Sequence, residues 1–380
     1  MEPIRRGKGV THSERYLARL ADSTFLELWS YPNTFIDKRS APTADGKELA
    51  DLLVVCGDDV IIFSDKSVAW PPGNIQLSWA RWYRRAVKKS VDQIRGAERW
   101  LRQFPERVFL DPACTKRLPI ELPPLARRRV HGIAVALGAQ AACSSHFSEP
   151  DGSLMVCGHL KGDAHTDTAA DDFVPFAFGD VDPDGPFVHV FDETALDFVL
   201  RELDTVSDFV RYLTQREKAI RAGQIFHAAS EADLLGFYLQ CKDETGRPHF
   251  PDPSETRTDG FVLAPGLFRE WFASREYHRV KAERKPSYIW DRLIRVFADN
   301  IIAGTSVEIA GELPNPKRAE PALRIMALEN RIMRQALGSM FADVLQQAER
   351  EAKDRFVRVV LPTHGGTDPE VCYVFLVLAY

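Results

Sequence analysis

The sequence has no run of about 18 apolar residues, so nothing in it predicts a membrane-spanning helix. Its first residues, Met-Glu-Pro-Ile-Arg-Arg-Gly-Lys, lack the apolar stretch of a secretory signal, and we therefore expect a cytoplasmic protein. The six cysteines are scattered without close pairing, which favours reduced core thiols over a disulfide framework. Basic residues are not in excess, because the net charge is -5, so any contact with nucleic acid must depend on a local basic patch.

Three motifs of common enzyme classes are also absent: a Gly-x-x-x-x-Gly-Lys-Ser/Thr loop, a Gly-x-Gly-x-x-Gly turn after a strand, and a Gly-x-Ser-x-Gly elbow. Nucleotide hydrolysis, dinucleotide binding and α/β-hydrolase chemistry therefore have no sequence support. What is present is a composition of 45% hydrophobic and 27% charged residues, which is ordinary for a globular protein. A length of 380 residues favours two domains, or one domain with a large extension.

The first half of the chain alternates apolar strand patterns with amphipathic helix patterns. Two β-branched apolar runs flank Gly57-Asp58-Asp59, which predicts a β-hairpin. The most periodic stretch comes after it and predicts one helix with a basic outer face. The expected elements are helices over residues 12–21, 25–29 and 76–103 and strands over 48–56, 60–66, 129–137 and 152–157. Residues 30–36 have the pattern of a strand or a turn.

The pattern changes in the second half, and a polar, turn-rich stretch at about residues 165–185 predicts a boundary there. We accordingly expect a first domain over residues 1–170 and a second, α+β domain over residues 171–380. No internal repeat is visible. The elements expected in this half are strands over 187–191, 356–361 and 371–380, the last two as a hairpin, and helices over 196–213 and 319–353.

The predicted hairpin brings an aspartate close to a lysine. Asp51 begins one strand, and Ser64, Asp65 and Lys66 end the other, so the turn places the two groups side by side. Phosphodiester hydrolysis needs carboxylates that hold divalent cations, together with a cation that supports the developing negative charge. The hairpin therefore predicts a candidate nuclease site.

These residues resemble the PD-(D/E)xK nuclease superfamily, in which an acid-bearing helix precedes a hairpin with Asp and then (Asp/Glu)-x-Lys, followed by a helix that often carries Gln. The resemblance covers roughly residues 10–160 and implies a restriction-endonuclease-like α/β fold, a mixed sheet flanked by helices. It implies Mg²⁺ or Mn²⁺ as cofactor, with Glu14, Asp51 and Asp65 as acidic metal ligands. Lys66 would lie near the attacked phosphate, and Gln93 near the scissile group or the metal.

The sequence departs from this family at position 64, where Ser64 occupies the place of the second acid. Because side chains alternate along a strand, Ser64 and Lys66 should share one face of the sheet while Asp65 points to the other. Serine is a poorer ligand for a divalent cation than a carboxylate. Either Asp65 or Glu48 moves into the site, or metal binding is weakened or lost.

Basic residues on the helix after the hairpin recur at positions i, i+3, i+4, i+7 and i+8, which predicts one positively charged stripe suited to a phosphate backbone. Trp79 and Trp82 flank this stripe and fit base stacking or core packing, and we favour packing for at least one of them. The cluster at 127–129 is a candidate extension of the same surface. The stripe consists of Arg81, Arg84, Arg85, Lys88 and Lys89.

Two further groups of metal-binding residue types occur before residue 170. Cys143-x-x-His146 and Cys157-x-His159 offer four zinc-ligand types, but both cysteines adjoin apolar runs and we favour buried thiols. The loop containing His165 has no partner spacing of a catalytic site, and we interpret it as surface.

Two interpretations of the function remain open. The first is a metal-dependent endonuclease acting on DNA or RNA, with a bacterial host-defence or antiviral role suggested only by analogy of fold. The second is a catalytically degenerate nuclease fold that binds nucleic acid or protein. Besides nucleic acid, the expected partners are a second copy of the chain or another protein. We expect no contact with a membrane.

Overall fold

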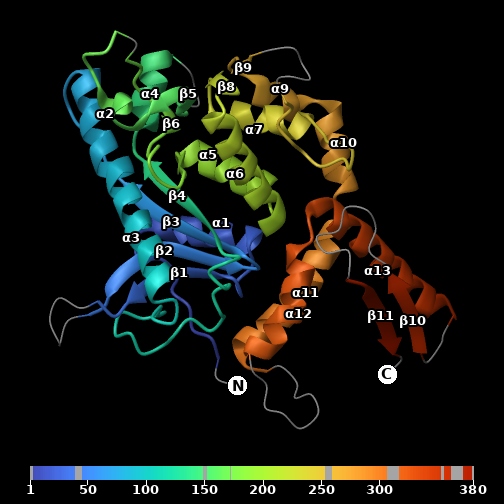
Figure 1. Cartoon of the computed structure of the whole chain (residues 1–380). Helices are drawn as coiled ribbons and strands as arrows, with labels where there is room; N and C mark the ends of the chain where they lie inside the picture. Colours follow the sequence, from blue (N-terminus) through green and yellow to red (C-terminus); the bar gives the residue numbers. More distant parts are fainter. Residues whose placement is uncertain are drawn as a thin grey trace.

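The computed structural model describes residues 3–38, 45–148, 152–171, 173–252, 259–305, 316–351, 355–360 and 371–378. Its main sheet has five strands in the order β1-β2-β3-β4-β7 (Figure 1). The first three strands are antiparallel neighbours, whereas β4 and β7 pair in parallel. The strands are β1 (Ser30–Ile36), β2 (Lys47–Cys56), β3 (Asp59–Ser67), β4 (Arg129–Leu137) and β7 (Val188–Phe191).

The predicted hairpin of β2 and β3 is confirmed. Cys56 pairs with Asp59, so Gly57 and Asp58 alone form the turn, and Gly57 has the positive φ of 63° that favours glycine in such turns. The apolar β-branched residues of both strands are buried, since helices cover the sheet on both faces. This hairpin fixes the positions of Asp51 and Lys66.

One helical stretch over residues 75–103 connects β3 to its parallel neighbour β4, as the helical periodicity predicted. It is not uniform, because a π-helical turn separates two α-helices. A π turn holds more residues per turn than an α-helix and shifts the register of the helix on its C-terminal side. The three segments are α2 (Ile75–Tyr83), η1 (Arg84–Lys88) and α3 (Lys89–Gln103).

A second sheet of four strands has the order β6-β5-β8-β9 and lies with α4 and α7 at the upper end of the molecule in Figure 1. It takes β5 from before residue 170 and the other strands from after it. Its elements and the helices around it are α4 (Gln140–Phe147), β5 (Met155–Lys161), η2 (Gly162–Thr166), β6 (Ala177–Asp180), α5 (Glu193–Glu202), α6 (Val206–Arg221), β8 (Ile225–Ala228), α7 (Glu231–Gln240) and β9 (Phe261–Leu263).

Strand pairing does not follow the predicted division at residue 170. β7 lies beyond that residue and completes the first sheet, while β5 lies before it and belongs to the second. The division into two domains stays a prediction. The fold class is confirmed at the level of an α/β protein with mixed sheets flanked by helices and a helical C-terminal region.

The C-terminal region packs helices against a β-hairpin (Figure 1). Trp29 Nε1 donates to Glu320 Oε1 at 2.7 Å, which ties this region to the start of β1. The predicted closing hairpin is confirmed, although its connection over residues 361–370 lies outside the described residues. The elements are α9 (Leu267–Ala273), α10 (Arg275–Glu283), α11 (Ser287–Ala303), α12 (Pro316–Leu328), α13 (Arg331–Glu351), β10 (Arg355–Val360) and β11 (Tyr373–Leu378).

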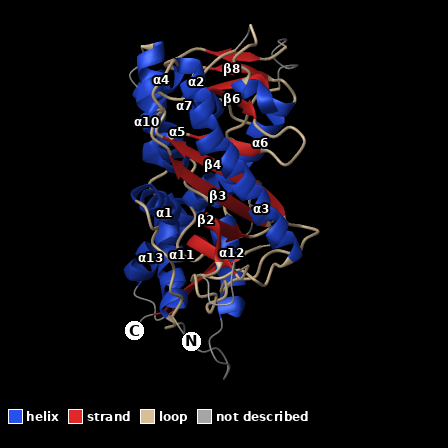
Figure 2. Cartoon of the chain, turned by 90° about the vertical axis from the view of Figure 1, so that its left-hand side faces the viewer, coloured by secondary structure: helices blue, strands red, loops and turns tan. Residues whose placement is uncertain are grey.

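The two faces of the main sheet are covered by different helices. Phe63 on β3 lies 6.2 Å from Phe25, just after α1 (His12–Thr24), and 6.4 Å from Phe209 on α6, measured between ring centroids. Its neighbour Ser64 instead contacts Gln93 on α3. Figure 2 shows α3 lying across β3 and β4 on this second face. Because successive side chains point to opposite faces, α1 and α6 cover one face and α3 the other.

Three sequence predictions of helices were wrong. Residues 25–29 form turns, in which Leu26 has a positive φ of 63°, and not a short helix. The helix predicted over 196–213 is two helices, because α5 ends and Thr205 caps α6 by accepting from the Asp208 N–H. The helix predicted over 319–353 breaks likewise between α12 and α13, where the Asn330 side chain accepts from the Met333 N–H. Helical periodicity continues across both breaks, so it cannot show them.

No helix among the described residues is long and apolar enough to cross a membrane.

Candidate nuclease site

Asp51 and Lys66 are in contact, as the hairpin predicted. The Nζ of Lys66 donates to Oδ2 of Asp51 at 3.1 Å and also to the carbonyl oxygen of Asp65 at 3.2 Å. The backbone N–H of Asp65 donates to the same Asp51 oxygen at 2.6 Å. The Asp51 side chain is 3% exposed and that of Lys66 is 28% exposed. The pair therefore has a fixed carboxylate beneath an ammonium group that solvent can reach.

Ser64 lies on the same face as this pair. Leu52 pairs with Phe63, so Asp51 and Ser64 are the next neighbours across the ladder. The Ser64 hydroxyl donates to Oε1 of Gln93 at 3.0 Å and lies 3.2 Å from the hydroxyl of Ser90. The residue in the place of the second acid is thus fully buried and holds the predicted Gln93 beside Lys66.

Asp65 points to the opposite face of the sheet, toward α1. Its side chain is 7% exposed, and neither carboxylate oxygen has a hydrogen-bond partner among the described residues. Burial, and then the charges of Asp51 and Glu14, raise the pKa of Asp65 to about 7, although the nearby Ser13 side chain acts in the opposite direction. The alternation argument made from the sequence is therefore confirmed, and Asp65 is not a neighbour of Ser64 and Lys66 on the α3 face.

Glu14 has a structural role that the sequence analysis did not assign to it. It closes a capping box at the start of α1, where the Thr11 hydroxyl accepts from the Glu14 N–H and Glu14 Oε2 accepts from the Thr11 N–H. The Asn33 amide bridges two acids, because its Nδ2 donates to Glu14 at 2.9 Å and to Glu48 at 3.1 Å. Despite its own burial, the hydrogen bonds from Asn33, Val10 and Thr11 lower the pKa of Glu14.

The three acids proposed as metal ligands do not meet. No group of three His, Cys, Asp or Glu side chains within the described ranges is arranged to hold a metal ion, so Glu14, Asp51 and Asp65 do not form a ready-made cage. Burial, and then the charge of Asp51, raise the pKa of Glu48, so these two carboxylates are close enough to interact. Asp51 and Glu48 are therefore the candidates for a divalent cation that takes one or two protein carboxylates and completes its shell with water and phosphate oxygens.

A groove of 680 Å³ opens at this site, and we call it the Lys66 groove. Glu48, Lys66 and Gln93 line it together, from β2, β3 and α3. Its lining holds five basic and two acidic side chains, so it is positively charged although the chain is acidic. The basic residues are Lys38, Lys47, Lys66, Lys89 and Arg99.

Only one of these cations has an ion-pair partner within the described part of the chain, namely Lys66.

No family model, curated protein or solved structure matches this chain. The chemistry of the Lys66 groove is therefore inferred from its geometry alone.

The predicted basic stripe is exposed along most of its length, but only Lys89 among its members lines the groove. Arg84, Arg85 and Lys88 lie in the π-helical turn, which the α-helical spacing argument could not foresee. Of the other groove cations, Lys38 follows β1, Lys47 begins β2, Lys66 lies on β3 and Arg99 lies on α3. Lys38 and Arg99 are 61 positions apart in the sequence. No linear pattern marks such a set.

Base stacking by the tryptophans is ruled out by their burial. Trp79 and Trp82 are both fully buried, with ring centroids 5.5 Å apart, so both pack in the core. The arginines at 127–129 do not extend a free basic surface either. Arg129 forms two hydrogen bonds with Asp59, and Arg128 donates to the carbonyl oxygens of Leu101 and Pro123.

The remaining sequence candidates are structural. Cys143 and Cys157 are buried, as favoured, and the described residues provide no zinc ligand group. Asp163, Ala164 and Asp167 of the His165 loop are exposed, as interpreted, but His165 itself is 1% exposed and accepts from the Gly179 N–H through Nε2. Its carbonyl oxygen accepts from Trp79 Nε1, so this loop anchors the second sheet to α2.

Proposed function

We propose that the chain is a metal-dependent nuclease that cleaves phosphodiester bonds in DNA or RNA bound in the Lys66 groove. The observation that carries this proposal is the 3.1 Å contact between Lys66 Nζ and Asp51 Oδ2 at the edge of a positively charged groove. The order of helix, antiparallel strands, helix and parallel strand is that of the nuclease superfamily which the sequence resembles. Both features support the proposal.

Each residue at this edge has a definite task in the proposed reaction. Asp51 and Glu48 would hold the divalent cation, whose chemistry is to activate water and to stabilise the leaving oxygen. The Lys66 ammonium, oriented by Asp51, would donate to a phosphate oxygen as negative charge develops on it. Ser64 fixes the Gln93 side chain next to this position. Incubation of the purified protein with plasmid, single-stranded DNA and RNA, each with Mg²⁺ or Mn²⁺, tests the activity.

A second candidate function is supported by one specific observation. Ser64 occupies the place of an acid and is committed to Gln93 and Ser90, and the described residues include no three-ligand metal group. A nuclease fold that has lost catalysis would bind nucleic acid in the Lys66 groove without a metal. Binding that is equally tight with Mg²⁺ and with a chelator, together with no cleavage of any substrate, would favour this candidate over the first.

Nucleic-acid binding in the groove should depend on salt through the groove cations. Each phosphate contact contributes about 0.9 to the slope of log K against log salt for duplex DNA. We therefore expect the double variant Lys47→Met/Arg99→Met to reduce this slope by about 1.8. Fluorescence anisotropy of a labelled duplex over a range of salt concentrations measures it.

The matched control is Arg81→Met/Arg84→Met, which removes the same number of exposed charges from outside the groove. We expect the slope to change by less than about 0.5 in this variant. If the control pair lowers the slope as much as the groove pair does, the nucleic acid lies along the exposed stripe and not in the Lys66 groove.

A further inference from the structure

The wall of the Lys66 groove lacks a side chain at Gly96, in the middle of α3. A glycine inside a helix stabilises it less than an alanine does, so its presence calls for a physical reason. The backbone at Gly96 is α-helical, and a Cβ there would meet no atom of the described residues within 4 Å beyond the helix backbone itself. Neither the backbone conformation nor the packing of the described residues therefore requires this glycine.

No other glycine in the described ranges has this combination. Each of them has either a positive φ or an atom within 3.1 Å of the position that a Cβ would take, as Gly132 has Ile94 at 2.7 Å. Close approach of a ligand to the backbone is a further use of glycine. The space at Gly96 is therefore suited to a group from outside the chain that passes over α3 inside the groove.

One face of α3 lies along the Lys66 groove. Gln93, Gly96 and Trp100 line it at positions i, i+3 and i+7 of the helix, so the glycine separates an amide from an indole. Gly96 lies about 5 Å along the helix axis from Gln93, which Ser64 holds beside Lys66. A group that rests on Gly96 is thus next to the place of the scissile phosphate.

The indole of Trp100 is held in place by its neighbours. It is half-buried, its Nε1 donates to the Arg107 carbonyl oxygen at 3.0 Å, and the Phe104 ring centroid lies 4.8 Å from its own. The Arg107 guanidinium lies 5.2 Å from the Trp100 ring centroid and pairs with Asp37. Because the polar N–H of the indole is already satisfied, the part of it that lines the groove offers a ligand an aromatic surface.

Apolar and amide side chains line the same groove. Ile36 and Leu49 are buried in its wall, and Gln103 adds an exposed amide one helical turn beyond Trp100. Within the described ranges Gln93 uses its Oε1 toward Ser64, which leaves its amide NH₂ to donate. A nucleobase combines a flat apolar face with hydrogen-bonding edges, and it is the part of a nucleic acid that such a surface fits.

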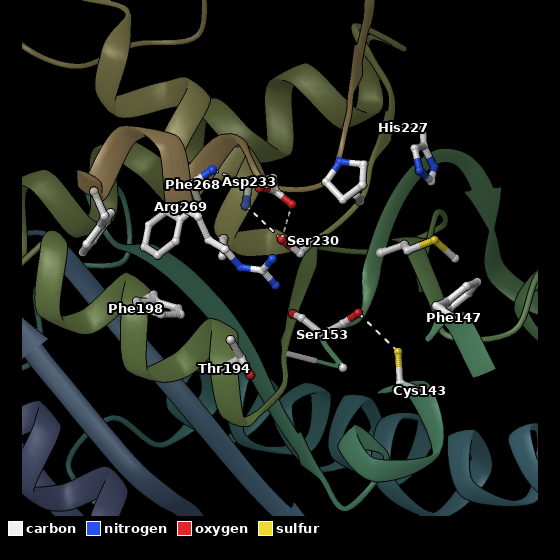
Figure 3. Close-up of a pocket in the computed structure, with 17 residues that line it drawn as sticks. Cys143, Phe147, Ser153, Thr194, Phe198, His227, Ser230, Asp233, Phe268 and Arg269 are labelled. Atoms are coloured by element: carbon white, nitrogen blue, oxygen red, sulfur yellow. Dashed lines mark hydrogen bonds between the residues drawn. The ribbon is translucent and has the colours of Figure 1, made fainter. Parts of the chain in front are cut away.

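A second cavity, of 490 Å³, lies between α4 and β5 on one side and α5, the start of α7 and α9 on the other (Figure 3). The hydrogen bonds drawn there join its own polar groups, because Ser230 donates to Asp233 and the Cys143 thiol to the Ser153 carbonyl oxygen. Its described lining contains one permanent cation, Arg269, against five in the Lys66 groove. A polyanion therefore fits the Lys66 groove better than this cavity.

We propose that the base next to the scissile phosphate lies on Trp100 over Gly96, so that the protein prefers nucleic acid with unpaired nucleotides. The inference rests on the proposed function, because it places the substrate in the Lys66 groove. The groove volume of 680 Å³ is that of a small-molecule site, about 300–1,000 Å³, which suits a nucleotide and not a whole duplex. A base within a duplex must first be turned out of its stack, whereas a base in a single strand need not be.

Fluorescence anisotropy with two labelled strands of equal charge tests this inference. One is a short oligothymidine and the other an abasic strand of the same length, which has the same phosphates and no bases. A chelator is present throughout, so that binding is measured without cleavage. The wild type should bind oligothymidine about tenfold more tightly, a factor that stacking of one base on an aromatic ring supplies. A hairpin duplex with one bulged thymidine should likewise bind more tightly than the fully paired hairpin.

Three neutral variants locate the base. Gly96→Leu fills the space over α3 and should bring the tenfold ratio to about one, with abasic binding within about twofold of the wild type because no charge changes. Trp100→Leu should also remove the ratio, and Trp100→Phe, which keeps a ring, should restore most of it. The matched control Ala282→Leu adds the same side chain at an exposed position of α10 outside the groove and should keep the ratio.

The outcomes distinguish this inference from the nuclease proposal. Equal binding of the two strands or of the two hairpins by the wild type overturns it, even where the protein cleaves DNA or RNA with Mg²⁺. A Gly96→Leu protein that is folded by circular dichroism and keeps the tenfold ratio also overturns it. Should that variant not fold, an unchanged ratio in Trp100→Leu has the same meaning. A ratio that is lost in Gly96→Leu and Trp100→Leu supports the base site, and absence of cleavage would then remove only the catalytic proposal.

Discussion

Lys66→Met is expected to lower the rate of metal-dependent phosphodiester cleavage by about 10²-fold to 10³-fold, the loss typical when one preorganised donor to a developing oxyanion is removed. Methionine keeps the unbranched stem of the lysine and removes only its charge and its donors. Asp51 would lose its contact with Nζ at 3.1 Å but would keep the Asp65 N–H, so the hairpin should stay folded. Initial rates on the preferred substrate, measured at saturating metal, give the factor.

The matched control for this variant is Lys88→Met, an exposed lysine in the π-helical turn outside the Lys66 groove. It removes the same charge from the same protein, and we expect a rate within about twofold of the wild type, because it neither contacts Asp51 nor lines the groove. A Lys66→Met protein that cleaves as fast as the wild type would remove Lys66 from the reaction and with it the proposed nuclease function. Cleavage that disappears in Lys88→Met as well would point to a general loss of nucleic-acid binding.

The part of the site that the sequence could predict depends on short-range geometry. The β-hairpin was visible because two β-branched runs flank a two-residue turn, and strand alternation then placed Ser64 and Lys66 on one face and Asp65 on the other. Both inferences need only neighbouring residues and the regular geometry of a strand. The contact of Asp51 with Lys66 follows from them directly.

The rest of the site depends on long-range packing, which a single sequence does not encode in a readable pattern. The Lys66 groove gathers Lys38, Lys47 and Arg99 from three elements, and only their packing brings them together. The π-helical turn changes the helical register at the place where the spacing of the basic stripe assumed an unbroken α-helix. Thr11-x-x-Glu14 matches the sequence pattern of a capping box, whereas the contact of Glu14 with Asn33 on β1 depends on packing and is not visible in the sequence.

The largest expected effect on stability concerns Asp65. The folded protein holds the proton of this carboxyl up to about pH 7, whereas an ordinary aspartate releases it near 3.8. Between these values the folded state binds more protons than the unfolded state, so the free energy of unfolding falls as pH rises through this window. With about 1.4 kcal/mol per pKa unit, the loss is of the order of 4 kcal/mol and is complete above about pH 8.

Asp65→Asn removes the titrating carboxyl and should therefore remove this loss. Between pH 5 and pH 8 the free energy of unfolding of the variant should therefore rise relative to that of the wild type. Urea unfolding of both proteins at several pH values measures the difference, in which the titration of all other groups cancels. Burial is the largest cause of the raised pKa of Asp65, and the charge of Asp51 adds to it. Mg²⁺ held by Asp51 and Glu48 would offset the part that comes from Asp51, and we expect it to reduce the loss in the wild type alone. Parallel curves for the two proteins would show that Asp65 does not titrate in this window. A loss that Mg²⁺ leaves unchanged would contradict a cation beside Asp51, whether or not cleavage is observed.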